Sequence, residues 1–319
     1  MKKIKLALLS GGISSERQVS LNSGRQVFDA LDKDKYDITS YDPKTDLEQI
    51  VKDAPHIDVA LIILHGPFGE DGTVQGLLDL LDIPYQGAGV LGSAMAMNKL
   101  VAKRLYAGAN VPTPDYLAYF MKDAIDNDDI VDQLGLPVVV KPACAGSSQG
   151  MTLVKKKQDL DAALALGFEN DDCVIVEQYL KGLELTCGVL GNDDPVALPV
   201  IEIIPGKDHE FFDYTAKYTP GATREICPAR IDDATTEQVK DLAIKAHNAL
   251  FLKGYSRTDF ILCNNQLSVL ETNTIPGMTA TSLFPQSAQV AGYSFTQLLD
   301  QLIQLSIQEH EKQKLRRKT

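Results

Sequence analysis

Apolar and polar positions near the start of the chain follow strand-like and helix-like spacing in turn. Residues 4–9 (IKLALL) are a mostly apolar run typical of a buried strand, and residues 10–15 form a glycine-rich loop. Apolar residues then recur at helical spacing, namely Val19, Val27, Phe28 and Leu31. A second apolar run (59–64) leads into the loop HGPFGEDG (65–72) and a predicted helix over 74–81. Strands alternating with helices predict a parallel sheet, whose ligands bind beyond the carboxyl ends of its strands, where both loops lie.

The rest of the chain predicts a different order of elements, with more strands and fewer helices between them. A helix over 97–107 ends at Gly108 and the turn Pro112-Thr113-Pro114, which suggests a domain boundary nearby. We expect a small α+β unit after it, with strands over 136–141, 151–154 and 173–179 and a helix over 159–166. The remainder predicts strands over 185–190 and 196–204, a loop over 208–221, a helix over 235–252, a hairpin over 256–273 and a final helix over 295–308. The basic tail at 312–318 is expected to be a solvated helix end.

Composition narrows the class of protein. The chain has 319 residues, 44% of them hydrophobic and 23% charged, which is globular and excludes a disordered or fibrous chain. A formal net charge of −12 makes neither nucleic acid nor an anionic membrane the expected partner. The longest apolar run is too short to cross a bilayer, and the N-terminal segment is a strand and loop, not a signal peptide. Five cysteines without a CxxC pair indicate reduced thiols in a cytoplasmic protein.

The predicted hairpin carries the most informative polar pattern. Side chains on one strand alternate between faces, so Arg257 shares a face with Asp259, and Glu271 shares one with Asn273. If the loop has an odd number of residues, Asp259 pairs with Glu271 and all four lie on one face, while Phe260, Leu262 and Leu270 point into apolar packing. Two carboxylates and an amide oxygen are ligands suited to Mg²⁺. A salt-bridged surface hairpin is the alternative interpretation.

Two glycine-rich segments are candidates for phosphate binding, and the flanking residues support only the first of them. Residues 142–150 follow a strand that ends in Lys141, and their small side chains let backbone N–H groups approach a phosphate. A plain turn is the alternative, and a Walker A motif occurs nowhere in the chain. GAGVLG (87–92) matches GxGxxG but lacks a strong preceding strand and a following acidic strand end. We therefore expect these glycines to shape a turn before a helix.

Two single residues have competing interpretations. His65 opens the second glycine loop, where a neutral imidazole can orient a carboxylate, or can serve only as a hydrogen-bonded loop residue. Cys144 lies in the third glycine-rich loop without a histidine nearby in sequence, which argues against a nucleophilic role.

Eight stretches in order resemble the ATP-grasp carboxylate–amine ligases, and among them the D-alanine–D-alanine ligases. They are GGISSERQVSL (11–21), HGPFGEDGTVQG (65–76), MNKLVAK (97–103), VKPACAGSSQG (140–150), VEQYLKGLE (176–184), DYTAKY (213–218), GYSRTDF (254–260) and LETNTIPGMTATSL (270–283). The resemblance covers nearly the whole chain. It implies an α/β (α+β) three-domain ATP-grasp fold: an N-terminal parallel-sheet domain (1–97), a central domain (98–185) and a C-terminal domain (186–319), the last two sandwiching ATP.

The resemblance also implies roles for individual residues. It implies ATP contacts from Lys99, Lys141, Glu177, Gln178, Tyr179, Leu180, Glu184, Phe211 and Lys217. It implies two Mg²⁺ ions, replaceable by Mn²⁺, on Asp259, Glu271 and Asn273. The first D-alanine would lie at Glu16 and His65, the oxyanion at Arg257 and the N–H of Gly277, and the second D-alanine at Ser282 and Leu283. Ser147 and Tyr218 would belong to the hydrogen-bonded group that closes the mobile loop. The implied catalytic residues are Glu16, Ser147, Tyr218, Arg257 and Gly277.

The implied reaction joins two D-alanines for peptidoglycan precursor synthesis. A carboxylate is a poor acyl donor, so ATP first converts it to an acyl phosphate, and an amine then displaces phosphate. Tyr218 favours an amine acceptor, although a D-alanine–D-lactate or D-serine ligase remains an alternative. A non-catalytic nucleotide-binding protein and a dinucleotide-dependent oxidoreductase are alternatives of another class. The family further implies a cytoplasmic homodimer.

Overall fold

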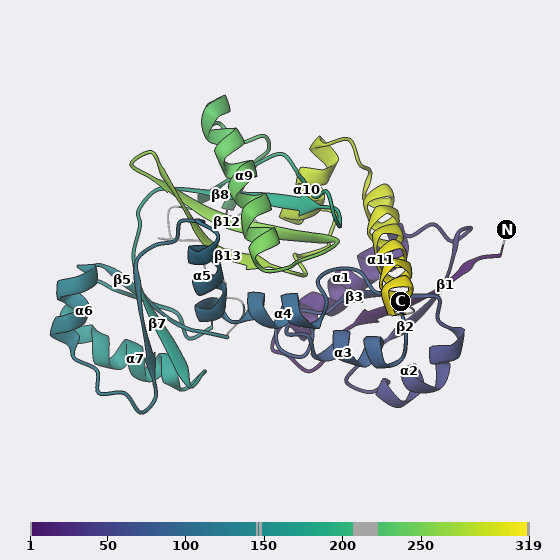
Figure 1. The fold of residues 1–319 in the computed structure, drawn as a ribbon, viewed down its shortest axis with the longest axis horizontal. Helices are drawn as coiled ribbons and strands as arrows, with labels where there is room; N and C mark the ends of the chain where they lie inside the picture. Colours follow the sequence, from purple (N-terminus) through teal and green to yellow (C-terminus); the bar gives the residue numbers. More distant parts are fainter. Residues whose placement is uncertain (1, 145, 147–148, 207–222, 318–319) are drawn as a thin grey trace.

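The computed structural model describes residues 2–144, 146, 149–206 and 223–317. Three sheets make up the described structure, and Figure 1 shows the central sheet at one end of the molecule and the N-terminal sheet at the other. No helix among these residues is long and apolar enough to cross a membrane. The five cysteines, all within the described ranges, are free thiols.

The N-terminal sheet is parallel, as the alternating pattern predicts, with strand order β2-β1-β3. Its elements are β1 (Ile4–Ser10), α1 (Arg17–Ala30), β2 (Tyr36–Tyr41), α2 (Leu47–Asp53), a 3₁₀ turn (Ala54–His56), β3 (Val59–Ile63) and α3 (Thr73–Leu80). Every residue of β3 is buried, because the sheet is covered on both faces.

One face of this sheet is covered by the end of the chain. Helix α11 (Phe295–Arg317) lies beside α1 and packs on β3 (Figure 1). Its residues Leu298, Leu302 and Ile303 share a buried cluster with Leu8 and Leu61. The helix extends beyond the predicted 295–308 and includes most of the basic tail.

Two helices connect this sheet to the next one. They are α4 (Val90–Met97) and α5 (Lys99–Gly108). The prediction of one helix over 97–107 is wrong at its start: Asn98 has extended backbone and its side chain accepts the N–H of Val101, so it caps α5. The GAGVLG segment forms the turn that leads into α4, with Gly89 as the N-cap.

The central sheet is antiparallel, with strand order β4-β7-β5-β6. Its elements are β4 (Tyr116–Phe120), α6 (Asn127–Leu134), β5 (Val138–Pro142), β6 (Thr152–Val154), a 3₁₀ turn (Lys157–Asp159), α7 (Leu160–Phe168) and β7 (Cys173–Gln178). Val138 and Val140 pack into a cluster with residues of α6 and α7. Alternation therefore places Val139 and Lys141 on the opposite face, which faces away from these helices.

The third sheet has the order β11-β10-β8-β12-β13, with β9 paired to β8. Its strands are β8 (Leu183–Leu190), β9 (Val196–Ala197), β10 (Ile201–Pro205), β11 (Thr223–Ile226), β12 (Tyr255–Cys263) and β13 (Gln266–Asn273). Helices α9 (Asp233–Ala249) and α10 (Leu283–Val290) pack against β8. The predicted strand over 196–204 is two strands, separated by a segment that contains Pro199, which has no N–H for a ladder.

The hairpin of β12 and β13 departs from the predicted loop. Its tip is two residues, Asn264 and Asn265, both at positive φ (48° and 62°), so the odd-numbered loop is wrong. The predicted pairs Asp259↔Glu271 and Arg257↔Asn273 are nevertheless present. A β-bulge restores them: Phe260 pairs with Val269, so Leu270 is the extra residue.

Candidate functional site

A cavity lies between the central sheet and the third sheet, lined from both sides. All seven predicted nucleotide residues that the structure describes line it: Lys99, Lys141, Glu177, Gln178, Tyr179, Leu180 and Glu184. The other two, Phe211 and Lys217, lie outside the described residues. An apolar lining from both sheets suits a flat heterocycle, and it is formed by Val139, Met151, Leu185, Ile203, Phe260 and Leu270.

Leu270 corrects one prediction about the hairpin. Phe260 does lie in the buried core, and Leu262 packs against it. Leu270, expected on that same apolar side, instead lines the cavity together with Glu271. The bulge explains this, because two consecutive residues of β13 oppose a single residue of β12 there.

Lys141 and Glu177 lie on the cavity face of the central sheet. The Nζ of Lys141 is 2.8 Å from Oε1 of Glu177, and the Nζ of Lys103, on α5, is 2.5 Å from Oε2. Burial by itself would raise the pKa of Glu177, but the two ammonium groups outweigh it and hold that pKa below its usual value. The sequence interpretation missed Lys103, although MNKLVAK contains it.

The hairpin brings its four predicted polar residues together on one face. Arg257 donates from Nε and Nη2 to the two oxygens of Asp259, both at 2.9 Å. Asn273 donates to Asp259 Oδ2 at 3.1 Å, and Thr186 of β8 donates to Oδ1 at 2.6 Å. Glu271 Oε2 lies 3.7 Å from the Nζ of Lys99, which links the hairpin to α5.

The donor chemistry of this face fits a hard cation. Among the described residues no three His, Cys, Asp or Glu side chains converge, so a site here would use two carboxylates and one amide. Asn273 donates to Asp259 through its nitrogen, which leaves the amide oxygen to act as a ligand. Asp259, Glu271 and Asn273 thus offer the oxygen ligands that Mg²⁺ prefers beside a phosphate.

A second pocket of polar groups lies beyond the carboxyl ends of β1 and β3. Glu16, the N-cap of α1, and His65 are both buried, with 6% and 7% of their surface exposed. Burial lowers the pKa of His65, and nearby Glu16 only partly offsets this, so the imidazole is held neutral. Its buried Nε2 has no hydrogen-bond partner among the described residues, although buried polar atoms are ordinarily paired.

Glu70 belongs to this pocket, and the sequence interpretation did not single it out. Its Oε2 accepts the N–H of Gly66 at 2.7 Å. Burial, reinforced by the charge of Glu16, raises the pKa of Glu70 to about 8. Gly66 has φ +71°, and a Cβ there would lie 2.9 Å from Oε2 of Glu16, so this position requires glycine.

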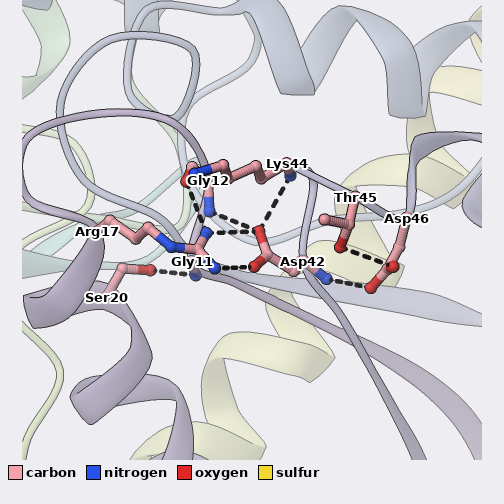
Figure 2. A network of polar contacts seen from close by, with 8 residues as sticks. All are labelled: Gly11, Gly12, Arg17, Ser20, Asp42, Lys44, Thr45 and Asp46. Atoms are coloured by element: carbon pink, nitrogen blue, oxygen red, sulfur yellow. Dashed lines mark hydrogen bonds and ion pairs between the residues drawn. The ribbon is translucent and has the colours of Figure 1, made fainter.

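An ion pair holds the loop that presents Glu16. The Nη2 of Arg17 is 2.5 Å from Oδ2 of Asp42, which follows β2, and Asp42 Oδ1 also accepts the N–H of Gly12 (Figure 2). Burial would raise the pKa of Asp42, but the hydrogen bonds from Arg17, Gly12 and Lys44 lower it overall. Gly11 has φ +95°, and a Cβ there would lie 2.7 Å from the Asp42 carboxylate. The loop is therefore fastened to β2 by backbone and side-chain contacts.

Contacts join the two pockets into one continuous site. A Cβ at Gly146 would lie 3.0 Å from Oε2 of Glu16, and Gln149, which lines the cavity, donates to Ser15 at 2.8 Å. The loop after β5 therefore reaches the pocket of the N-terminal sheet. The predicted catalytic residues Ser147 and Tyr218 lie outside the described residues.

The predicted acceptor residues lie at the start of α10. Ser282 is the N-cap of α10, and its Oγ accepts the N–H of Thr279 at 3.1 Å. A Cβ at Gly277 would lie 3.0 Å from this Oγ, so Gly277 and Ser282 are neighbours. Leu283 is buried in a cluster with Ile201 and Ile203.

Solved structures share this architecture over almost the whole chain. A crystal structure of D-alanine–D-alanine ligase from Bacillus anthracis in complex with ATP has a TM-score of 0.86 and 34% identity, covering 97% of this chain and 99% of that one. A VanG D-Ala:D-Ser ligase from Enterococcus faecalis has a TM-score of 0.82 and 33% identity, covering 96% and 100%. The fold is that of the ATP-grasp carboxylate–amine ligases.

Sequence relatives narrow the class further. The family models described as D-ala D-ala ligase N-terminus and C-terminus match residues 40–88 and 105–304. A D-alanine–D-alanine ligase from Syntrophobacter fumaroxidans is 58% identical over 308 residues, 97% of this chain and 99% of the relative. One from Desulfotalea psychrophila is 52% identical over 318 residues, 98% of each. The chain belongs to the D-alanine–D-alanine ligase family.

Proposed function

We propose that this protein is an enzyme that uses ATP to join two D-alanines into D-alanyl-D-alanine, for peptidoglycan precursor synthesis. The observation that carries the proposal is the continuity of the site. A nucleotide cavity with hairpin carboxylates adjoins a buried pocket that holds the carboxylate of Glu16 and the neutral imidazole of His65, whose Nε2 has no partner among the described residues. A mere nucleotide-binding protein does not need the second pocket.

The donor pocket suits the first D-alanine. The carboxylate of Glu16 attracts the substrate ammonium group, and the buried Nε2 of His65 is placed to meet a substrate oxygen. The substrate carboxylate attacks the γ-phosphorus of ATP, the bond to the bridging oxygen breaks, and ADP leaves. The product is an acyl phosphate, in which phosphate has become the leaving group.

The second step forms the peptide bond. The free amine of the second D-alanine attacks the acyl carbon, and the oxyanion that forms is stabilised by Arg257 and the N–H of Gly277. Phosphate then leaves and the attacking nitrogen gives up its proton. Ser282 and Leu283 would hold the second D-alanine, while Ser147 and Tyr218 would help exclude water from the intermediate.

Metal ions complete the proposal on the nucleotide side. Asp259, Glu271 and Asn273 would hold two Mg²⁺ ions, or Mn²⁺ in their place, which would neutralise charge on the phosphates. Lys99, Lys141 and Lys217 would contribute further positive charge, and Phe211 would contact ATP. The fit of the hairpin oxygens supports this assignment.

Acceptor choice is the main alternative within the family. The similarity to a D-Ala:D-Ser ligase keeps D-serine as a second candidate acceptor, with D-lactate after it. We further propose domains at 1–97, 98–185 and 186–319, a cytoplasmic location and a homodimer that binds neither nucleic acid nor membrane. Light scattering of the purified chain tests the dimer.

Product analysis tests the function. Phosphate release from Mg-ATP is measured with D-alanine alone, with D-alanine plus D-serine or D-lactate, with L-alanine and without addition, and products are identified by mass. Release that depends on D-alanine and yields the dipeptide supports the proposal. Release with another product reassigns the acceptor, and folded protein that releases no phosphate in any mixture overturns the catalytic assignment.

A further inference from the structure

Lys103 is a buried cation that the proposed chemistry does not use. Its side chain is 1% exposed, and it lies behind Glu177 and outside the cavity lining that the described residues outline. Burying an ammonium group is costly unless a counter-charge compensates it. The charge of Lys103 therefore needs an explanation.

Glu177 separates Lys103 from Lys141. One carboxylate oxygen lies 2.5 Å from Lys103 and the other 2.8 Å from Lys141. The Oε2 on the Lys103 side has no partner among the described groups other than this ammonium, which is therefore its compensating charge. The remaining surroundings of Lys103 are the carbonyl of Pro114 at 3.4 Å, the ring of Tyr116 at 4.9 Å and the more distant charge of Asp115.

Counting charges shows what the cluster presents to the cavity. Two ammonium groups and one carboxylate leave a net charge of +1, and only Lys141 and Glu177 line the cavity. Without Lys103, the charge of Glu177 would be balanced by Lys141 alone, and the pair would be neutral toward a phosphate. In a buried site such a change of one charge is weakly screened.

We propose that Lys103 is a positioning residue for the nucleotide: it neutralises Glu177 from behind, so that the positive charge of Lys141 stays available to an ATP phosphate. This inference rests on the proposed function, because it takes ATP as the occupant of the cavity. It assigns Lys103 no contact with substrate.

Removing or keeping the charge behind Glu177 tests the idea. In Lys103→Met the dissociation constant for ATP should rise at least about tenfold. In Lys103→Arg, which keeps a positive charge beside Glu177, it should stay within about threefold of the wild type. Lys157→Met, which removes an exposed lysine paired to Asp128, is the matched control. Displacement of a fluorescent nucleotide measures binding, and thermal unfolding checks the fold.

A pH profile gives a second readout that packing alone would not move. Burial lowers the pKa of Lys103 to about 8, although the charge of Glu177 partly opposes this. Wild-type affinity for ATP should therefore weaken as the pH rises through 8. Lys103→Arg keeps its proton and should show a flatter profile.

The possible results separate the inference from the function. Wild-type protein that binds no ATP refutes the proposed function. If the wild type binds ATP and folded Lys103→Met binds it equally well, or folded Lys103→Arg binds it as weakly as Lys103→Met, the positioning role is wrong. If Lys103→Met does not fold, the comparison of wild type and Lys103→Arg across pH decides, and parallel profiles overturn the proposal.

Discussion

The two halves of the site are built in different ways. On the nucleotide side, Arg257, Asp259, Glu271 and Asn273 project from paired strands, so the register of one hairpin sets their positions. On the donor side, Glu16 and His65 lie in loops beyond parallel strands, and their positions depend on contacts such as Arg17 with Asp42. Strand pairing is a repeating geometry, whereas each loop needs its own fastening. Substitutions in the hairpin should therefore lower turnover by removing a charged group. Substitutions near the loops should act by weakening the contacts that hold them in place.

Asp259→Asn should have the largest effect, because it removes a carboxylate charge without disturbing the strand. We expect turnover to fall by about two to three orders of magnitude, as for loss of a charged group at a phosphoryl-transfer site. The melting temperature should fall by a few degrees, because the ion pair with Arg257 is weakened, while the protein stays folded. Asp241→Asn, on the exposed face of the covering helix α9, is the control. Steady-state kinetics with unchanged turnover in Asp259→Asn would refute the role of the hairpin.

Asp42→Asn should have a smaller effect and act on the donor side alone. The variant weakens the ion pair with Arg17 and should loosen the loop that carries Glu16, at a cost of about 1 kcal/mol in unfolding free energy. The KM for D-alanine should rise by up to about tenfold, while the KM for ATP stays near wild type. Asp37→Asn, an exposed change in β2, the strand that Asp42 follows, controls for loss of charge. Equal changes in both KM values would contradict a local role.

Leu270→Ala tests the apolar contact that the hairpin makes with the nucleotide. The bulge turns Leu270 into the cavity, so truncation removes apolar contact with the nucleotide and should raise the KM for ATP by about three- to tenfold. Turnover at saturating ATP should persist, because no charged group is lost. Leu80→Ala, at a position 87% exposed, is the control. An unchanged KM for ATP would mean that Leu270 does not touch the nucleotide.

Glu70→Gln should have the smallest effect on turnover, and its effect is expected in the pH dependence of stability. The pKa of Glu70 is raised to about 8, above the value of an unfolded glutamate, so the folded state holds a proton that the unfolded state releases. The stability of the wild type should therefore fall as the pH rises from about 4.5 to 8, by at most about 1.4 kcal/mol per pH unit from this group. The neutral amide removes this dependence. Melting temperatures from pH 5 to 9 should show the variant gaining on the wild type. A constant difference would contradict a protonated Glu70 in the folded state.

Alternation and pairing made the hairpin face predictable from sequence, and apolar runs made β1 and β3 predictable, whereas β2 and α2 were not predicted. The sequence did not reveal why Asp259 pairs with Glu271. A two-residue tip alone would shift this pairing by one residue, and the bulge at Leu270 restores it. The break at Asn98 escaped prediction because one capping side chain decides it. Glu70 and Lys103 were not predicted, because their properties depend on residues distant in sequence. The partner of Glu70 is Glu16 and that of Lys103 is Glu177, and no local sequence pattern indicates such contacts.

The return of α11 to the first sheet has a consequence for synthesis. Strands β1 and β3 leave the ribosome early, but Leu298, Leu302 and Ile303, which cover them, are made after both antiparallel sheets. The apolar face that α11 covers therefore remains exposed to solvent while the rest of the chain is translated. Nascent chains that stop before residue 295 should bind chaperones through that face, and the finished protein should release them once the last helix has docked.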